Sequence, residues 1–280
     1  MGVCVRFCFS QNELYNVLAI WCGKLKTKFD MENECNNYFF SEGKKIQLYK
    51  NDCLNILPQI PNNSIDAIIC DLPFGITANK WDNIIPMDIL WKEYERIIKP
   101  KGNIILFGTG LFAFKLALSN EKLFRYDMVW KKSKSGSPFT AKYMPLKKHE
   151  MILVFGKPAS RYNPQMSVGE PYKRKWTPNK QNNMKYGIKG VQTDNKGTRH
   201  PTTVLDFTQK WRRQDQQHPT QKPIPLMDFL VSSFTDENDT VLDNTMGIGT
   251  TGIACKNLNR NFIGIEIEDG YFNIAKSKLL

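Results

Sequence analysis

The chain has 280 residues and a net charge of +12, from 39 lysines and arginines against 27 aspartates and glutamates. No apolar stretch approaches membrane-spanning length, and the seven cysteines are odd in number and form no C-x-x-C pair. This composition excludes a membrane-spanning chain and a disulfide-bonded secreted scaffold, indicates a reducing cytoplasm, and gives no reason to expect a metal. The excess of positive charge favours a nucleic-acid partner.

Residues 1–43 differ from the rest of the chain and are interpreted as an N-terminal extension. They hold four of the seven cysteines, and Arg6 interrupts the first apolar run, which argues against a signal peptide. We expect residues 1–30 to be added by an upstream start, so that the chain is non-native or disordered before Met31. Residues 44–280 are expected to form one domain.

Alternating strands and helices are predicted from Ile46 onward. β-branched runs that end at turn residues indicate buried strands, and apolar residues at helical spacing indicate the helices between them. The expected strands are Ile46–Tyr49, Ile65–Cys70, Asn103–Phe107, Tyr126–Lys131 and Glu150–Phe155, and the expected helices are Ile85–Lys99, Leu111–Ser119 and Ile224–Phe234. This order predicts an α/β fold in which helices cover both faces of a mostly parallel sheet.

The tetrapeptide Asp71-Leu72-Pro73-Phe74 follows a predicted strand, so Asp71 lies at a carboxyl strand end, where open α/β sheets bind ligands. An exocyclic amine on a flat ring is a poor nucleophile and needs hydrogen-bond acceptors for its N–H groups as it attacks. Asp71 can accept one bond, a carbonyl beside Pro73 the other, and Phe74 can stack on the ring. A base in a duplex reaches such a pocket only by leaving the stack. The alternative is an ordinary strand followed by a proline turn.

A second unit near the C-terminus has the order strand, acid, glycine turn, helix, strand, acid and helix over residues 240–279. Gly247 and Gly249 allow a sharp turn that approaches a ligand, and Glu266 ends the next strand, where it can bind ribose hydroxyls. Gly247-x-Gly-x-x-Gly252 also satisfies a dinucleotide pattern, so a nicotinamide or flavin cofactor is the alternative. Asp243 would repel a pyrophosphate but suits the amino group and sulfonium of S-adenosylmethionine, which we favour.

Positive charge is concentrated between these two units. Residues 130–217 carry 19 lysines and arginines against 5 acidic residues, a net of +14, and the rest of the chain is slightly acidic. The basic residues are interleaved with the aromatic residues Trp130, Phe139, Tyr143, Tyr162, Tyr172, Trp176, Tyr186 and Trp211. We interpret residues 130–217 as a target-recognition region that contacts phosphates, the alternative being a solvated basic loop without a partner.

Six motifs in one order resemble the amino-methyltransferases of DNA. They are Asn51-Asp-Cys-Leu54, Asp71-Leu-Pro-Phe-Gly75, Lys148-His-Glu150, His218-Pro-Thr-Gln-Lys-Pro223, Val241-Leu-Asp-Asn-Thr-Met-Gly-Ile-Gly-Thr-Thr251 and Phe262-Ile-Gly-Ile-Glu266. The tetrapeptide precedes the cofactor motif, as in the circularly permuted beta class, where phage-type N6-adenine methyltransferases look most similar. The resemblance covers about residues 44–280. It implies a Rossmann-like methyltransferase domain with a basic target-recognition insertion and a cofactor-binding unit at residues 218–280.

The resemblance also implies a role for each site residue. Asp71 would engage the target amine, a carbonyl of Leu72 or Pro73 would accept its second hydrogen bond, and Phe74 would stack on the base. The implied cofactor residues are Asp243, Thr245, Gly247, Gly249 and Thr250 around the methionine part, Glu266 at the ribose, Asp52 near the adenine and Lys222 at the carboxylate. The chain departs from the family at Leu72, Phe74 and Asn244, where proline, tyrosine and proline are more common.

These features predict an S-adenosylmethionine-dependent, site-specific methyltransferase that acts on adenine N6 of a flipped base in double-stranded DNA. An aspartate at position 71 favours adenine within the family, and cytosine N4 stays open. Methylation of cytosine C5 is excluded, because it requires a cysteine nucleophile where Phe74 stands. The remaining alternatives are an RNA or protein amine as substrate and a non-catalytic DNA-binding relative. Proteins of this class can form homodimers.

Overall fold

The computed structural model describes residues 38–41, 43, 45–75, 83–136, 138–174, 193–207 and 221–280. The predictions for residues 1–37, for His218 and for Trp176, Tyr186 and Trp211 in the basic region lie outside the described residues. Among the described helices, none is long and apolar enough to cross a membrane.

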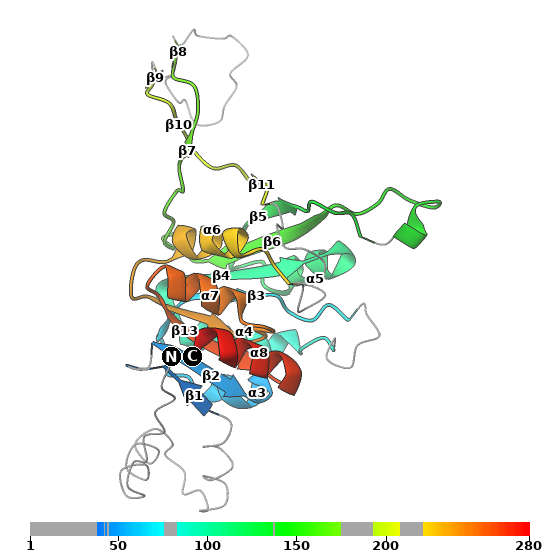
Figure 1. Cartoon of the computed structure of the whole chain (residues 1–280), viewed down its shortest axis with the longest axis vertical. Helices are drawn as coiled ribbons and strands as arrows, with labels where there is room; N and C mark the ends of the chain where they lie inside the picture. The colour runs from blue at the N-terminus through cyan, green and yellow to red at the C-terminus, as the bar shows by residue number, and fades with distance from the viewer. Residues whose placement is uncertain are drawn as a thin grey trace, which may run out of the picture.

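A nine-stranded sheet forms the centre of the described structure (Figure 1). Its strands, in spatial order, are β1 (Tyr38–Phe40), β2 (Ile46–Lys50), β13 (Asn261–Glu266), β12 (Thr240–Asp243), β3 (Ile65–Cys70), β4 (Ile98–Gly108), β6 (His149–Gly156), β5 (Phe124–Lys131) and β11 (Val204–Leu205). Only β1 and β6 in this sheet run against the others. The prediction of a mostly parallel sheet is therefore confirmed.

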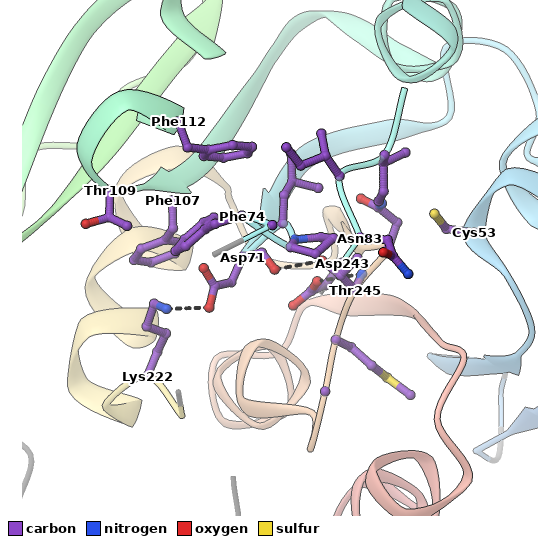
Figure 2. Close-up of a pocket in the computed structure, with 18 of the residues that line it drawn as sticks. Cys53, Asp71, Phe74, Asn83, Phe107, Thr109, Phe112, Lys222, Asp243 and Thr245 are labelled. Carbon is purple, nitrogen blue, oxygen red and sulfur yellow. Dashed lines mark hydrogen bonds and ion pairs between the residues drawn. The ribbon is translucent and has the colours of Figure 1, made fainter. Parts of the chain in front are cut away.

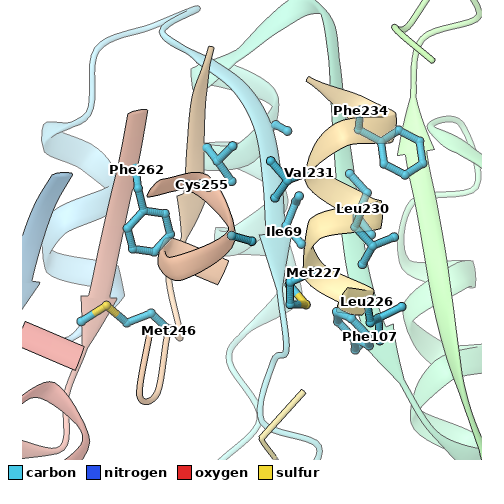
Figure 3. Packing of buried hydrophobic residues seen from close by; sticks show 14 of the residues in the cluster. Ile69, Phe107, Leu226, Met227, Leu230, Val231, Phe234, Met246, Cys255 and Phe262 are labelled. Atoms are coloured by element: carbon cyan, nitrogen blue, oxygen red, sulfur yellow. The ribbon is translucent and has the colours of Figure 1, made fainter. Parts of the chain in front are cut away.

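Helices cover both faces of the sheet. One face carries α6 (Ile224–Phe234), α7 (Thr250–Asn257) and α8 (Asp269–Leu279), and the other carries α3 (Cys53–Ile56), α4 (Met87–Ile97) and α5 (Gly110–Ser119). Strand β3 divides its side chains between them, because successive residues of a strand point to opposite faces. Ile69 packs towards α6 and α7 (Figure 3), with Ala67 in the same cluster, whereas Ile68 and Cys70 pack in the cluster that contains α4.

The predicted helices and strands are present, and the main difference lies between α4 and β4. The helix expected over Ile85–Lys99 ends at Ile97, and β4 begins at Ile98 instead of Asn103. Ile98 has extended backbone angles and pairs with Ile65 of β3. Pro100 could not have continued the helix, so the chain enters the sheet before the proline.

The basic region reaches solvent on two separate segments. Strand β6 belongs to the sheet, so residues 130–217 do not form one continuous insertion. One segment is the β5–β6 connection at residues 132–148, which includes a 3-10 turn at Pro138–Thr140. The other is an arm in which β7 (Ser167–Val168) pairs with β10 (Thr198–Arg199), and β8 (Tyr172–Arg174) with β9 (Thr193–Asn195). This arm projects away from the sheet (Figure 1).

Candidate active site

A cavity of about 940 Å³ opens at the carboxyl ends of the parallel strands. Strands β3 and β12 are direct neighbours, so the segments that follow them, at Asp71 and Asp243, face the same space. The predicted site residues that line this cavity are Asp52, Asp71, Leu72, Pro73, Phe74, Lys222, Asp243, Thr245, Gly247, Thr250 and Glu266. Two motifs about 170 residues apart in sequence therefore form one site, as the sequence predicts.

Asp71 lines the cavity, and its two carboxylate oxygens differ in their partners. Its Oδ2 forms an ion pair with Lys222 Nζ (Figure 2). Its Oδ1 is buried and has no hydrogen-bond partner within the described part of the chain. Burial raises the pKa of Asp71, and the charge of Lys222 opposes that rise. An acceptor oxygen without a donor, on a side chain that lines a cavity, is suited to a ligand N–H group.

Lys222, expected at the cofactor carboxylate, lines the cavity and is paired with two carboxylates of the protein. It is only 6% exposed, and its ammonium lies between Asp71 and Glu150, with Nζ 3.2 Å from Glu150 Oε2. Burial lowers the pKa of Lys222, but the two carboxylates more than offset this effect, so its pKa is raised. Lys132 Nζ donates to the other oxygen of Glu150 at 2.8 Å. The result is a chain of alternating charges that ends at Asp71.

Phe74 contributes to an aromatic wall above Asp71. Its ring lies 5.0 Å from that of Phe112, centroid to centroid, and Phe107 lies beside Asp71 and Lys222 (Figure 2). Leu72 points into the core and is 2% exposed, which leaves its main chain rather than its side chain for a ligand. A flat ring placed against this wall would find apolar surface on one face and Asp71 at its edge.

Asp243 is a buried acid at the start of the glycine turn. Its Oδ2 accepts a hydrogen bond from Thr251 Oγ1 at 2.6 Å, and its Oδ1 accepts one from the Thr245 amide at 3.2 Å. Burial raises the pKa of Asp243 to about 7. A cationic ligand group would stabilise the ionised carboxylate, so the residues present fit the sulfonium and amino group of S-adenosylmethionine.

The two turn glycines have different roles. Gly247 (φ +53°) lines the cavity, and nothing lies within 4 Å of the position that a Cβ would take there. Gly249 (φ +79°) is the one predicted site residue that does not line the cavity. A Cβ at this position would lie 2.9 Å from Leu279 Cδ1 of α8. Gly249 therefore permits the turn and the close packing of α8, and its expected contact with the cofactor stays a prediction.

Glu266 and Asp52 line the cavity, and their carboxylates also accept hydrogen bonds from main-chain amides. Glu266 accepts hydrogen bonds from the amides of Gly247 and Glu268, each at 2.8 Å. Asp52 caps α3 by accepting a hydrogen bond from the Leu54 amide at 2.8 Å. Both acids thus shape the cavity wall, and each carboxylate retains acceptor capacity for a ligand.

The loops after β3 and β12 are tied together by hydrogen bonds. Thr245 Oγ1 donates to the main-chain oxygen of Asp71 at 3.1 Å. Asn244, where the family has proline more often, accepts hydrogen bonds at its Oδ1 from the hydroxyl of Tyr94 at 2.5 Å and from Cys70 Sγ at 2.9 Å. Its departure from the family is therefore compensated by a buried polar cluster that joins α4, β3 and the cofactor turn.

Replacing Tyr94 by phenylalanine is expected to destabilise the protein by about 1–2 kcal/mol, because it removes the hydroxyl that donates to Asn244 and leaves a buried acceptor with one donor fewer. The free energy of unfolding in urea measures the effect. Tyr172→Phe, in the exposed arm, is the matched control and should change stability by less than about 0.5 kcal/mol. An equal loss of unfolding free energy in both variants would show that the hydrogen bond from Tyr94 to Asn244 makes no specific contribution to stability.

Several cavity residues were not predicted as site residues. Glu150 was noted only as part of a family motif, and its contacts with Lys132 and Lys222 depend on strands that are distant in sequence. Phe107 and Phe112 read as ordinary core residues of a strand and a helix. The signal that could have indicated Glu150 is its charge in an otherwise apolar strand, since a buried carboxylate requires a partner.

A family model described as DNA methylase, for N6 and N4 methyltransferases, matches residues 65–277, which is more than half of the chain. The chain belongs to this family. S-adenosylmethionine is the cofactor of the DNA methylases, and this protein is an S-adenosylmethionine-dependent DNA methyltransferase. The predicted membership of the DNA amino-methyltransferases and the predicted cofactor are confirmed, and the nicotinamide and flavin alternatives are set aside. No group of acids, cysteines and histidines among the described residues could hold a metal ion.

Individual relatives support this assignment. The type II methyltransferase M.BglII of Bacillus subtilis is 29% identical over 253 residues, covering 82% of this chain and 67% of its own. M2.MboI of Moraxella bovis is 24% identical and covers 86% of this chain and 90% of its own. The crystal structure of the M1.HpyAVI-SAM complex is 28% identical, has a TM-score of 0.56, and covers 84% of this chain and 100% of its own. The PvuII cytosine-N4-specific methyltransferase, 18% identical with a TM-score of 0.62, shares the fold and covers 84% of this chain and 86% of its own.

Proposed function

We propose that this DNA methylase transfers a methyl group to adenine N6 of a flipped base at a specific site in double-stranded DNA. The observation that supports it best is the unpartnered Oδ1 of Asp71 in a cavity shared with the glycine turn. Similarity to type II methyltransferases supports site-specific action and a place beside a restriction enzyme. The order of tetrapeptide before cofactor motif supports the circularly permuted beta class and its phage-type members.

Asp71 and the residues after it would hold the target amine. Asp71 Oδ1 accepts one N–H, the carbonyl of Leu72 or Pro73 accepts the second, and Phe74 stacks on the base. These bonds direct the nitrogen lone pair away from the ring and towards the methyl group, which S-adenosylmethionine supplies in electrophilic form on a sulfonium. Lys222 holds Asp71 in place and opposes its protonation. The methylated amine then loses a proton to solvent, so no dedicated base is needed.

The cofactor would occupy the other half of the cavity. Asp243 faces its positively charged groups, with Thr245, Gly247 and Thr250 around the methionine part. Glu266 would accept hydrogen bonds from the ribose, and Asp52 would lie near the adenine. The pairing of Lys222 with Asp71 favours a role for this lysine at the target amine over its expected contact with the cofactor carboxylate.

Aspartate at position 71 favours adenine N6 over cytosine N4, as a tendency within the family. Cytosine N4 is the second candidate, because the family includes both activities and one structural neighbour is cytosine-N4-specific. An amine of RNA or of a protein is a third candidate substrate, which no comparison favours. The buried free cysteines Cys53, Cys70 and Cys255 support a cytoplasmic location. The expected homodimer stays a prediction, which sedimentation of the full chain tests.

Incubation with S-adenosylmethionine carrying a labelled methyl group and with unmethylated double-stranded DNA, followed by mass spectrometry of the nucleosides, tests the proposal. N6-methyladenine is the expected product. N4-methylcytosine would support the proposed active site but would show that the target base is cytosine. Label in RNA or protein but not in DNA would overturn the proposed substrate.

A further inference from the structure

The connection between β5 and β6, called here the β5–β6 loop, leaves the sheet at the edge that holds the active-site cavity. Strand β5 runs in the same direction as β4, so its carboxyl end lies at that edge. Main-chain hydrogen bonds close the base of the loop, from the Lys132 amide to the Lys148 oxygen at 2.9 Å and from the Gly136 amide to the Lys147 oxygen at 3.0 Å. Beyond them the loop projects from the sheet (Figure 1).

The tip of this loop exposes large apolar side chains. Phe139 is 93% exposed and Tyr143 is 84% exposed, and Met144 follows at 59%. The tip is nevertheless ordered locally, because the amides of Tyr143 and Met144 both donate to the Thr140 oxygen, at 2.9 and 3.0 Å. These aromatic side chains on a formed turn are not packed against the described part of the chain, and exposed apolar side chains of this kind indicate a binding surface.

Charge and position identify what this surface binds. The loop also carries the basic residues Lys132, Lys134, Lys142, Lys147 and Lys148. Its base lines the cavity through Lys132, Gly136 and Lys147, and Lys132 connects through Glu150 to the lysine that pairs with Asp71. Aromatic side chains between lysines, at the tip of a loop whose base lines a pocket for a base, fit a nucleic-acid duplex at the point where it opens.

We infer that the β5–β6 loop is a wedge that enters the base stack beside the target nucleotide, with Phe139 and Tyr143 as the inserting side chains. The inference rests on the proposed function, since only a base in a duplex must be flipped out. Removal of the base leaves a gap, and unstacking costs a few kcal/mol. A ring stacked in the gap offsets that cost and delays the return of the base, while the lysines hold the adjoining phosphates.

Methylation of matched duplexes by the full chain tests the wedge. The variants are Phe139→Ala, Tyr143→Ala and the two combined, and Phe114→Ala on α5 is the control, since Phe114 is also exposed (58%) but does not line the cavity. One duplex carries the mapped methylation site fully paired, and the second has an abasic position opposite the target base. The combined variant should lose about 10-fold or more in kcat/KM on the paired duplex. It should lose less than about threefold on the abasic duplex, where the target is already unpaired.

A second readout separates opening of the duplex from binding in general. With 2-aminopurine as the target base, the wild type and Phe114→Ala should raise fluorescence as the base leaves the stack, and the combined variant should raise it less. Equal losses on the two duplexes, or no loss on either, would overturn the wedge while leaving the proposed function intact. A wild type that methylates neither duplex would instead overturn the proposed function. Unchanged thermal unfolding of the variants would show that the folded state is preserved.

Discussion

Replacement of Asp71 by asparagine is expected to lower the rate of methyl transfer by about 100- to 1,000-fold, the scale seen when one preorganised polar group is removed from a transition state. Asparagine keeps the shape of the side chain but loses the negative charge that pairs with Lys222, and it offers only one acceptor oxygen. The structure predicts that cofactor binding survives, because Thr245 is tied to the main-chain oxygen of Asp71 and not to its carboxylate. The affinity for S-adenosylmethionine should change by less than about threefold, or about 0.7 kcal/mol.

Single-turnover methyl transfer and calorimetric titration with S-adenosylmethionine measure the two quantities separately. Asp228→Asn in α6 is the matched control, since Asp228 does not line the cavity, and it should alter neither. Retention of more than a tenth of the wild-type rate by Asp71→Asn would contradict the role given to Asp71. Parallel loss of transfer and cofactor binding would place Asp71 in the cofactor site instead.

The affinity for S-adenosylmethionine is expected to weaken about 10-fold from pH 8 to pH 6, because Asp243 has a pKa of about 7 and a cationic cofactor binds its ionised form. Below this pKa, binding must first remove a proton. The stability of the protein without cofactor depends on pH in the opposite direction. The folded-state pKa lies above the ordinary value of 3.8, so this group's contribution to stability falls as the pH rises from about 4 to 7.

Titrations with S-adenosylmethionine at several pH values, with Asp243→Asn as the comparison, measure this dependence. The asparagine variant should bind more weakly at pH 8 and show a flatter profile, because the titrating carboxylate is gone. Asparagine has one acceptor oxygen for the two donors that Asp243 binds, the Thr251 hydroxyl and the Thr245 amide, so the thermal unfolding of the variant is measured alongside its binding. A wild-type profile that is flat between pH 6 and 8 would show that the cofactor does not contact an ionised Asp243.

The sequence was sufficient for the central strands, for the longer helices and for the edge of the sheet that carries the site. The short β-branched run Ile65–Cys70 lies between turn residues, which favours a buried strand over a helix, and an acid directly after such a strand lies at its carboxyl end. The boundary between α4 and β4 was harder, because Ile98 joins the sheet by pairing with Ile65, a partner distant in sequence. Local periodicity contains no information about such a pairing.

The contacts within the site were less predictable than its members. Lys222 pairs with Asp71, 151 positions away in the sequence, and Tyr94 reaches Asn244, 150 positions away. Neither pair leaves a local pattern, and each depends on the neighbouring strands that the fold brings together. Gly249 shows a related limit, because a glycine required for packing against Leu279 looks the same in sequence as one required for contact with a cofactor.

The structure of the protein with S-adenosylmethionine bound tests most directly whether one cavity serves both the cofactor and the target amine. We expect the cofactor to lie along the glycine turn, with its amino group and sulfonium near Asp243 and its methyl carbon directed towards Asp71 Oδ1 and the face of Phe74. A cofactor whose methyl carbon points away from Asp71, or one bound outside this cavity, would contradict the proposed site.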